Sequence, residues 1–181
     1  MMLLGDPAIN SVVTRLWGPS KLASSAELHA RIDRFATVIR EGSGNPKPGK
    51  KVFEQQCARC HTLFSQGGKV GPDLTNYRRD DLETMLLNIV NPSAEIREGF
   101  VGSVVAARDG RILSGVIVEQ DKNVIILRDT DGHDTTLDRK TIDTMRPSEK
   151  SLMPDALLET LTGQQVRDLF AYLRSTQPLV D

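Results

Sequence analysis

Cys57-Ala58-Arg59-Cys60-His61 is the most informative stretch of this 181-residue chain. Its two thiols are spaced so that both can add to the vinyl groups of one haem, and the imidazole that follows is placed to coordinate the iron. A zinc half-site would need a second ligand pair, but the only other histidines are His29 and His133, and there is no further cysteine. A redox dithiol would follow a strand of a βαβ unit, and the sequence shows no such unit. The pattern therefore predicts covalent attachment of one haem, with His61 as an axial ligand.

Charge is balanced over the chain but not around the cysteine motif. The 23 basic and 24 acidic residues nearly cancel, so nothing global favours nucleic acid or a membrane surface. Residues 45–79 hold seven basic side chains against two acidic ones, a net charge of +5 (Lys47, Lys50, Lys51, Arg59, Lys69, Arg78 and Arg79 against Glu54 and Asp73). This excess is either a solvated face or a docking surface for an acidic redox partner, because steering fields raise encounter rates.

The spacing of apolar residues is helical over the first part of the chain. Asp6-Pro7 and Gly18-Pro19 have the chemistry of a helix start and a helix stop, so a first helix is expected between them. An apolar stripe over residues 25–40 predicts a second helix (Leu28, Ile32, Phe35 and Ile39). The Gly/Pro/Asn cluster of residues 41–46 then predicts a linker.

Three further helices are expected. One opens at Pro48 and runs into the cysteines. Asp80-x-x-Glu83 has the form of a capping box for a helix that Asn91-Pro92 ends. Thr162-x-x-Gln165 is a second capping box, and it precedes a terminal helix whose apolar face is Val166, Leu169, Phe170 and Leu173.

From Phe100 the sequence takes on the character of strands. Four runs rich in β-branched residues are separated by turn sequences such as Asp109-Gly110 and Asp131-Gly132, and they predict successive antiparallel hairpins (residues 101–107, 112–119, 124–127 and 135–137). The expected fold class is mainly α with a β insert (α+β). The expected domains are an N-terminal helical arm or tail of a preceding domain at 1–44 and a haem domain at 45–181, with the antiparallel insert at 99–150 inside it.

His61 fills one axial position, so a second ligand must come from elsewhere in the chain. A thioether suits electron transfer, because it raises the reduction potential and closes the iron to outside ligands. Met153 is favoured, since it lies in a loop, precedes a stiffening proline and is soon followed by a helix. Met145, in a loop before Arg146-Pro147, remains open as an alternative.

The other candidate ligands fit other roles. Met85 falls on an apolar helical stripe, which indicates core packing. His29 lies toward the polar side of its helix, and His133 lies in a turn beside Asp131 and Asp134. Both histidines are expected to be solvated.

Seven stretches between residues 45 and 177 together resemble one family, and the run Asn91 to Ile96 is the most particular of them (Pro48 to Phe53, Cys57 to His61, Gly71 to Thr75, Asn91 to Arg97, Asp109 to Arg111, Ser151 to Pro154, Leu161-Thr162). They resemble the haem-binding cytochrome c domain found at the C-terminus of large exported proteins of planctomycetes and related bacteria (the planctomycete/verrucomicrobial type). In those proteins the domain is sometimes fused to propeller-type dehydrogenase-like domains.

The resemblance implies a class I cytochrome c core interrupted by a small β module. Cys57 and Cys60 would bind one haem c through two thioethers, with His61 as the proximal and Met153 as the distal ligand. The carbonyl of Pro72 would accept the hydrogen bond that orients the His61 ring. Such a domain transfers electrons and needs no catalytic residues. Its partner would be a redox protein or a fused dehydrogenase domain, with no role for nucleic acid.

The expected location is periplasmic or otherwise exported, because c-type cytochromes receive their haem outside the cytoplasmic membrane. Met1 to Leu4 is too short an apolar run for a signal peptide, and no stretch approaches the roughly 18 apolar residues of a membrane span. The chain is therefore expected to be a piece of a longer exported protein. Two alternative functions remain: a haem sensor or weak peroxidase with a labile distal methionine, and an interaction module built on the β insert.

Overall fold

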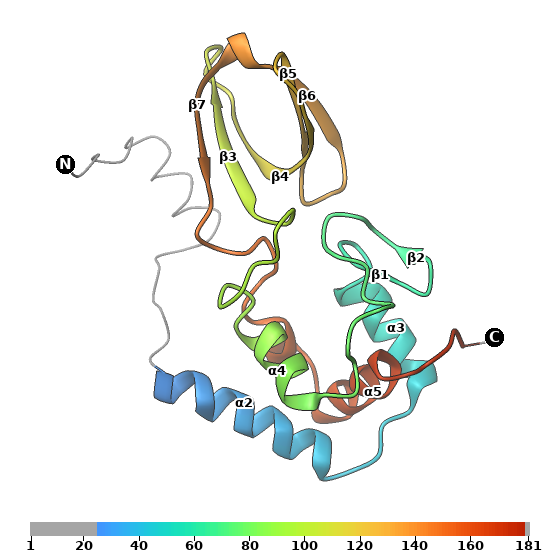
Figure 1. The fold of residues 1–181 in the computed structure, drawn as a ribbon. Helices are drawn as coiled ribbons and strands as arrows, with labels where there is room; N and C mark the ends of the chain where they lie inside the picture. The colour runs from blue at the N-terminus through green and yellow to red at the C-terminus, as the bar shows by residue number, and fades with distance from the viewer. Residues whose placement is uncertain (1–24, 180–181) are drawn as a thin grey trace. The chain divides into compact units, whose positions relative to one another are not determined.

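The computed structural model describes residues 25–179, and the helix expected between Asp6 and Gly18 lies outside them. Within the described part, the chain forms two compact units. We call residues 25–96 with 153–179 the helical unit, and residues 97–152 the sheet unit (Figure 1). Four helices and a five-stranded antiparallel sheet confirm the predicted α+β class. No helix in the described part is long and apolar enough to cross a membrane.

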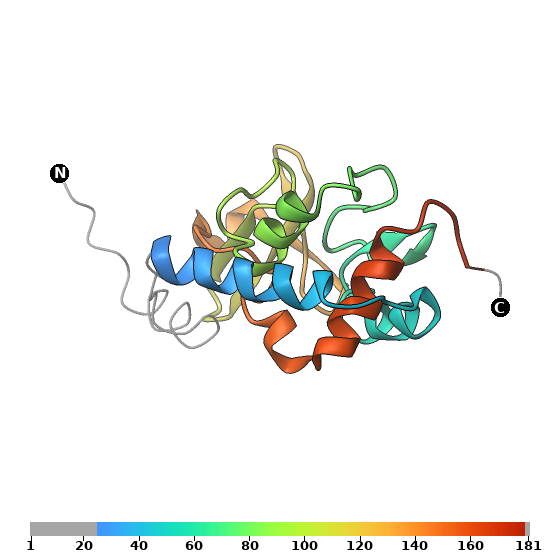
Figure 2. The ribbon, with the colours of Figure 1, turned by 90° about the horizontal axis from the view of Figure 1, so that it is seen from below.

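The helical unit is built from four α-helices and one short 3₁₀ segment: α2 (Ser25–Arg40), α3 (Pro46–Gln56), α4 (Leu82–Val90), η2 (Leu157–Thr160) and α5 (Gly163–Leu173). A short hairpin of two-residue strands, β1 (Thr62–Leu63) and β2 (Gln66–Gly67), follows the cysteine motif. Helix α3 packs on α5, and α2 packs on α4 and α5 (Figure 2). All four helices contribute buried apolar side chains to one core, which includes Phe35, Phe53, Leu86, Val166, Leu169 and Phe170.

The contact between α3 and α5 is close because α3 carries a glycine there. A Cβ at Gly49 would lie 1.9 Å from the carbonyl oxygen of Asp168 and 2.9 Å from Cβ of Tyr172. The backbone N–H of Asn45 donates to the Asp168 carboxylate at 2.8 Å, which ties the start of α3 to the same helix. These contacts fix the helix that leads into the cysteine motif.

The sheet unit is a single antiparallel sheet with strand order β6-β5-β4-β3-β7. Its elements are β3 (Gly102–Ala107), β4 (Ile112–Gln120), β5 (Val124–Arg128), β6 (Asp134–Asp138), the 3₁₀ segment η1 (Arg139–Thr141) and β7 (Ile142–Pro147). Register shifts occur within β3 and within β4. The sheet has its own core, formed by Val105, Ile125, Leu127 and Leu137.

The four predicted helices that fall within residues 25–179 are confirmed, with two corrected starts. Residues 25–40 form α2, and both hydrogen bonds of the Thr162/Gln165 capping box are present. Helix α3 begins at Pro46 instead of Pro48, because the side chain of Asn45 accepts from the N–H of Lys47 and caps the helix earlier. Helix α4 is capped by Asp81 instead of Asp80.

The reason for the second correction is local hydrogen bonding. The Asp81 carboxylate accepts from the backbone N–H groups of Glu83 and Thr84, so the N-cap lies one residue later than the expected box. The pKa of Asp81 is lowered by these bonds, led by those to Thr84.

The four predicted strand runs are confirmed, but a fifth strand was missed. Met145 lies in β7, opposite Val105 of β3, so its placement in a loop was wrong. Residues 142–147 alternate between half-buried and exposed positions. They include charged residues and a proline, so their composition does not predict a strand, and the strand is stabilised by pairing with β3. The β1–β2 hairpin was also missed, and its turn holds Phe64 and Ser65 at positive φ (52° and 65°).

Candidate haem-binding site

The cysteine motif lies at the end of α3. The N–H of Cys57 donates to the carbonyl of Phe53 at 2.8 Å and closes the helix, and Cys57 is its C-cap. The N–H groups of Cys60 and His61 both donate to the carbonyl of Cys57, at 3.0 and 2.9 Å. One tight turn therefore holds both thiols and the imidazole together, and the two cysteines are not joined in a disulfide.

Both thiols are held in the protonated form near neutral pH. Burial, with a smaller contribution from Cys60, raises the pKa of Cys57 to about 12. Burial also raises the pKa of Cys60, although the charge of Arg59 acts against it. Thioether formation adds an S–H bond across a vinyl double bond, so two free thiols in one turn match the reaction that attaches haem c.

The ring of His61 is fixed by its neighbours on the loop. Its Nδ1 lies 2.9 Å from the carbonyl oxygen of Pro72, the group to which the resemblance gives this role. Because a carbonyl can only accept, Nδ1 carries the proton and Nε2 is left with its lone pair for a metal. Burial lowers the pKa of His61, against the opposing effect of the Pro72 bond, which favours the neutral imidazole that ligation needs.

Gly71 gives this ring its space. A Cβ at position 71 would lie 2.6 Å from Cε1 and 2.9 Å from Nδ1 of His61. The carbonyl of Cys60 accepts from the N–H groups of Val70 and Gly71, at 3.1 and 2.8 Å, so the backbone of the motif itself holds this glycine against the ring. The loop that contains Val70 and Gly71 thus folds back onto the cysteine motif.

The three methionines considered as distal ligands differ in burial and in the unit to which they belong. Met153 is half-buried in the helical unit and is not part of the helical core. Met85 is 8% exposed and packs in that core, as its apolar stripe indicated. Met145 is 38% exposed on β7 of the sheet unit.

Both remaining histidines are exposed, as expected. His29 lies on α2. His133 lies in the turn between β5 and β6, with its Nδ1 3.5 Å from the Asp129 carboxylate.

Arg79 is a half-buried residue that the sequence analysis counted only as part of the basic excess. Its Nη1 donates to the carbonyls of Leu173 and Ser175, at 2.6 and 2.8 Å, and its guanidinium lies 5.0 Å from the ring centre of Phe64. Burial lowers its pKa, against the opposing effects of Tyr172 and Asp73. Its Nε is buried and has no hydrogen-bond acceptor among the described residues.

These residues fit a covalently bound haem. Two thiols and an imidazole that offers Nε2 come from one turn, and Gly71 leaves the imidazole its room. Redox-active dithiols use a lowered cysteine pKa, whereas both values are raised here. The donor set therefore favours haem over a dithiol centre.

Comparison with known proteins points the same way. Residues 46–112 match the family model described as "Cytochrome c". Over 40 residues the chain is 45% identical to a protein named "Cytochrome c" from Ginkgo biloba. That match covers 22% of this chain and 35% of the length of the plant protein.

Proposed function

We propose that this chain, which contains a cytochrome c domain over residues 46–112, transfers single electrons through one covalently bound haem c. In this proposal Cys57 and Cys60 form the two thioethers, His61 ligates through Nε2, and Met153 is the distal ligand. The observation that best supports it is the 2.9 Å contact between His61 Nδ1 and the Pro72 carbonyl, because it fixes the tautomer and direction of a ligand that follows two free thiols.

The haem supplies an iron that cycles between ferric and ferrous states, and the chain tunes that couple. The Pro72 carbonyl makes the His61 imidazole a better electron donor, which stabilises ferric iron. The Met153 thioether acts in the opposite direction and raises the potential. No bond of a substrate is made or broken, so no residue is assigned a catalytic role.

The wider context of the domain is part of the proposal. We infer from the matching stretches that the domain is of the planctomycete/verrucomicrobial type and belongs to a larger exported redox protein. A fused dehydrogenase domain or a separate redox protein would supply its electrons. This location agrees with the chemistry of haem c attachment, which takes place outside the cytoplasmic membrane.

The basic side chains around the motif are proposed to attract an acidic partner. Five of the basic residues are exposed (Lys47, Lys51, Arg59, Lys69 and Arg78), whereas Arg79 is half-buried and bonded to backbone carbonyls. Electrostatic steering by exposed charges is screened by salt. The rate at which the anion hexacyanoferrate oxidises the ferrous holoprotein should therefore fall as ionic strength rises. At low ionic strength, this rate should be lower in Lys51→Glu than in the wild type. A rate independent of salt and of this charge would contradict the docking role.

The function is tested by a redox titration of the holoprotein matured in a host that attaches haem c. The wild type should carry one haem that acidified organic solvent does not extract, and it should titrate reversibly with a one-electron slope. The paired variant Cys57→Ser with Cys60→Ser should lose the covalent haem. An extractable haem in the wild type, or a chain that takes up none, would overturn the proposal.

A further inference from the structure

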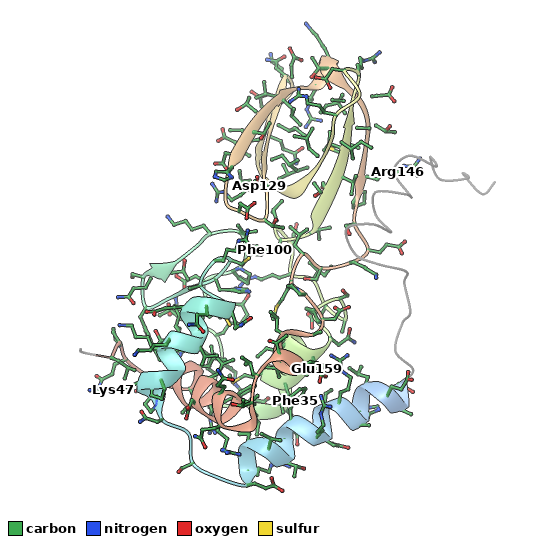
Figure 3. All side chains as sticks on the ribbon, turned by 180° about the vertical axis from the view of Figure 1, so that it is seen from behind. Phe35, Lys47, Phe100, Asp129, Arg146 and Glu159 are labelled. Carbon is green, nitrogen blue, oxygen red and sulfur yellow. The ribbon has the colours of Figure 1, made fainter. Side chains whose placement is uncertain are left out.

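Helix α2 is an addition to the matched domain that nonetheless packs as part of the helical unit. It ends at Arg40, before the first residue of the 46–112 match. Phe35 and Ala36 are 6% and 5% exposed and belong to the helical core. Figure 3 labels Phe35 and Glu159, which lie close together where α2 meets the segment before α5.

Two arginines of α2, Arg31 and Arg34, contact residues 155–160, which follow the proposed distal ligand. Nη2 of Arg31 donates to the backbone carbonyl of Asp155 at 2.7 Å. Nε of the same guanidinium lies 3.3 Å from Oε1 of Glu159. Arg34 also pairs with the Glu159 carboxylate. One arginine therefore bridges both ends of this segment, from an element more than 100 positions earlier in the sequence.

These contacts form a network instead of an isolated surface pair. The side chains of Arg31 and Glu159 are 28% and 34% exposed, so both are partly shielded from solvent. A single exposed ion pair contributes little, but a charge-assisted bond to a backbone carbonyl restrains the chain itself. Leu158, between the two anchor points, is 3% exposed and packs in the same core as Phe35.

Met153 lies just before this segment in the chain. Residues 153–156 form no helix or strand, and Asp155 is only two positions beyond the methionine. A ligand on an irregular stretch is held by the attachments of its neighbours, and among the described residues Arg31 supplies one directly to the backbone.

We propose that Arg31 is a positioning residue for Met153: by tying residues 155–160 to α2, it keeps the Met153 thioether at the haem iron. The inference rests on the proposed function, in which Met153 is the distal ligand. Helix α2 would thereby limit how often the iron opens to outside ligands.

The test is the rate at which imidazole binds to the ferric holoprotein of the full chain, because imidazole can bind only after the distal ligand leaves. Arg31→Ala should speed binding by about tenfold, which corresponds to about 1.4 kcal/mol and to the loss of one charge-assisted bond. Arg40→Ala is the matched control, since it removes the same charge from the same helix but pairs with Glu83 of α4 at 3.9 Å. Its rate should equal that of the wild type.

Two more variants separate positioning from stability. Arg31→Lys should give an intermediate rate, because an ammonium group keeps the charge but lacks the planar fork that reaches both acceptors. Val52→Ala, a core substitution in α3, should lower the stability of the unit without speeding imidazole binding.

Each outcome decides one question. Equal rates for Arg31→Ala and Arg40→Ala, or an equal acceleration in Val52→Ala, would overturn the inference. A wild type without the near-infrared absorption of a ferric iron–thioether bond would overturn the proposed ligation by Met153 instead.

Discussion

At the scale of single residues, His61 shows what the sequence could and could not reveal about the site. The order of thiols and imidazole along one turn was enough to predict haem attachment. The role of Pro72 came only from family resemblance, because a backbone acceptor 11 residues away leaves no mark of its own. The contact of Gly71 with the ring was not foreseen, since close approach is a property of the folded loop.

Gly71→Ala should displace the His61 ring, because the added Cβ would lie 2.6 Å from Cε1. A weaker bond to the Pro72 carbonyl makes the imidazole a poorer donor, so the reduction potential of the holoprotein should rise. A tenfold change in the relative stability of the two oxidation states moves a one-electron potential by about 59 mV. Gly163→Ala is the control, since the nearest atom there is 3.5 Å away; equal potentials in all three proteins, measured by spectroelectrochemistry, would refute this account of Gly71.

Arg79 is the residue that sequence analysis misjudged by treating it as one of several surface charges. Two of its acceptors, the carbonyls of Leu173 and Ser175, lie 94 and 96 positions further along the chain. Burial of a charged group through contacts so distant in sequence has no local signature. Its partial burial comes from the contact of its guanidinium with the end of α5.

Glu159 should make the stability of the helical unit depend on acidity. Its pKa is lowered chiefly by Arg34 and further by Arg31, so its contribution is present above the usual value of 4.5 and is lost as pH falls through the lowered value. Because the partners are partly exposed, the effect should stay below about 1 kcal/mol. The free energy of unfolding in urea should be compared at about pH 6 and about pH 3.5, above and below the usual pKa of a glutamate. Between the higher and the lower pH, Glu159→Gln should lose less stability than the wild type. An equal loss would show that the pairing contributes nothing to stability.

At the scale of elements, predictions succeeded where local sequence chemistry determines the structure. The apolar stripe of α2 and the Thr162/Gln165 box of α5 gave correct helices, because periodicity and caps are local. Strand β7 was not predicted, since its stability comes from pairing with β3 and not from its own composition. The start of α3 was placed two residues late because either of two prolines, Pro46 or Pro48, could open the helix.

The α3–α5 contact yields the sharpest prediction at this scale. Gly49→Ala should destabilise the helical unit by about 3 kcal/mol or more, because the new Cβ meets backbone atoms of Asp168 that cannot move aside. Lys51→Ala, at an exposed position of the same helix, should change stability by less than about 0.5 kcal/mol. Chemical denaturation of the two variants measures the difference, and similar midpoints would mean that the helices can separate without cost.

At the scale of the whole molecule, the described residues form two units with separate cores. The helical core draws only on residues of the helical unit, and the sheet core only on residues 105–142 of the sheet unit. The proposed boundaries of the sequence domains, including the insert at 99–150, remain a prediction, but the change of periodicity near Phe100 does precede the first strand of the sheet, β3, which begins at Gly102. Nothing in the sequence indicated that α2 packs with the other helices of the helical unit, because that packing depends on contacts with α4 and α5.

Ile125→Ala should therefore affect one unit only. Ile125 is fully buried in the sheet core, and its truncation should cost about 2–5 kcal/mol. In thermal unfolding, circular dichroism should show that the sheet unfolds at a lower temperature than in the wild type. The haem absorbance should still change at the wild-type temperature. A single transition at a lower temperature in both signals would contradict separate cores.

The central claim, a haem held by His61 and Met153 for electron transfer, is tested most directly by magnetic circular dichroism of the holoprotein in both oxidation states, with and without carbon monoxide. We predict a low-spin haem in both states that ignores carbon monoxide, and an open site that binds it in Met153→Ala. Carbon monoxide binding by the wild type, or an unchanged spectrum in Met153→Ala, would contradict the account: the first result would point to a sensor or peroxidase, and the second to another distal ligand.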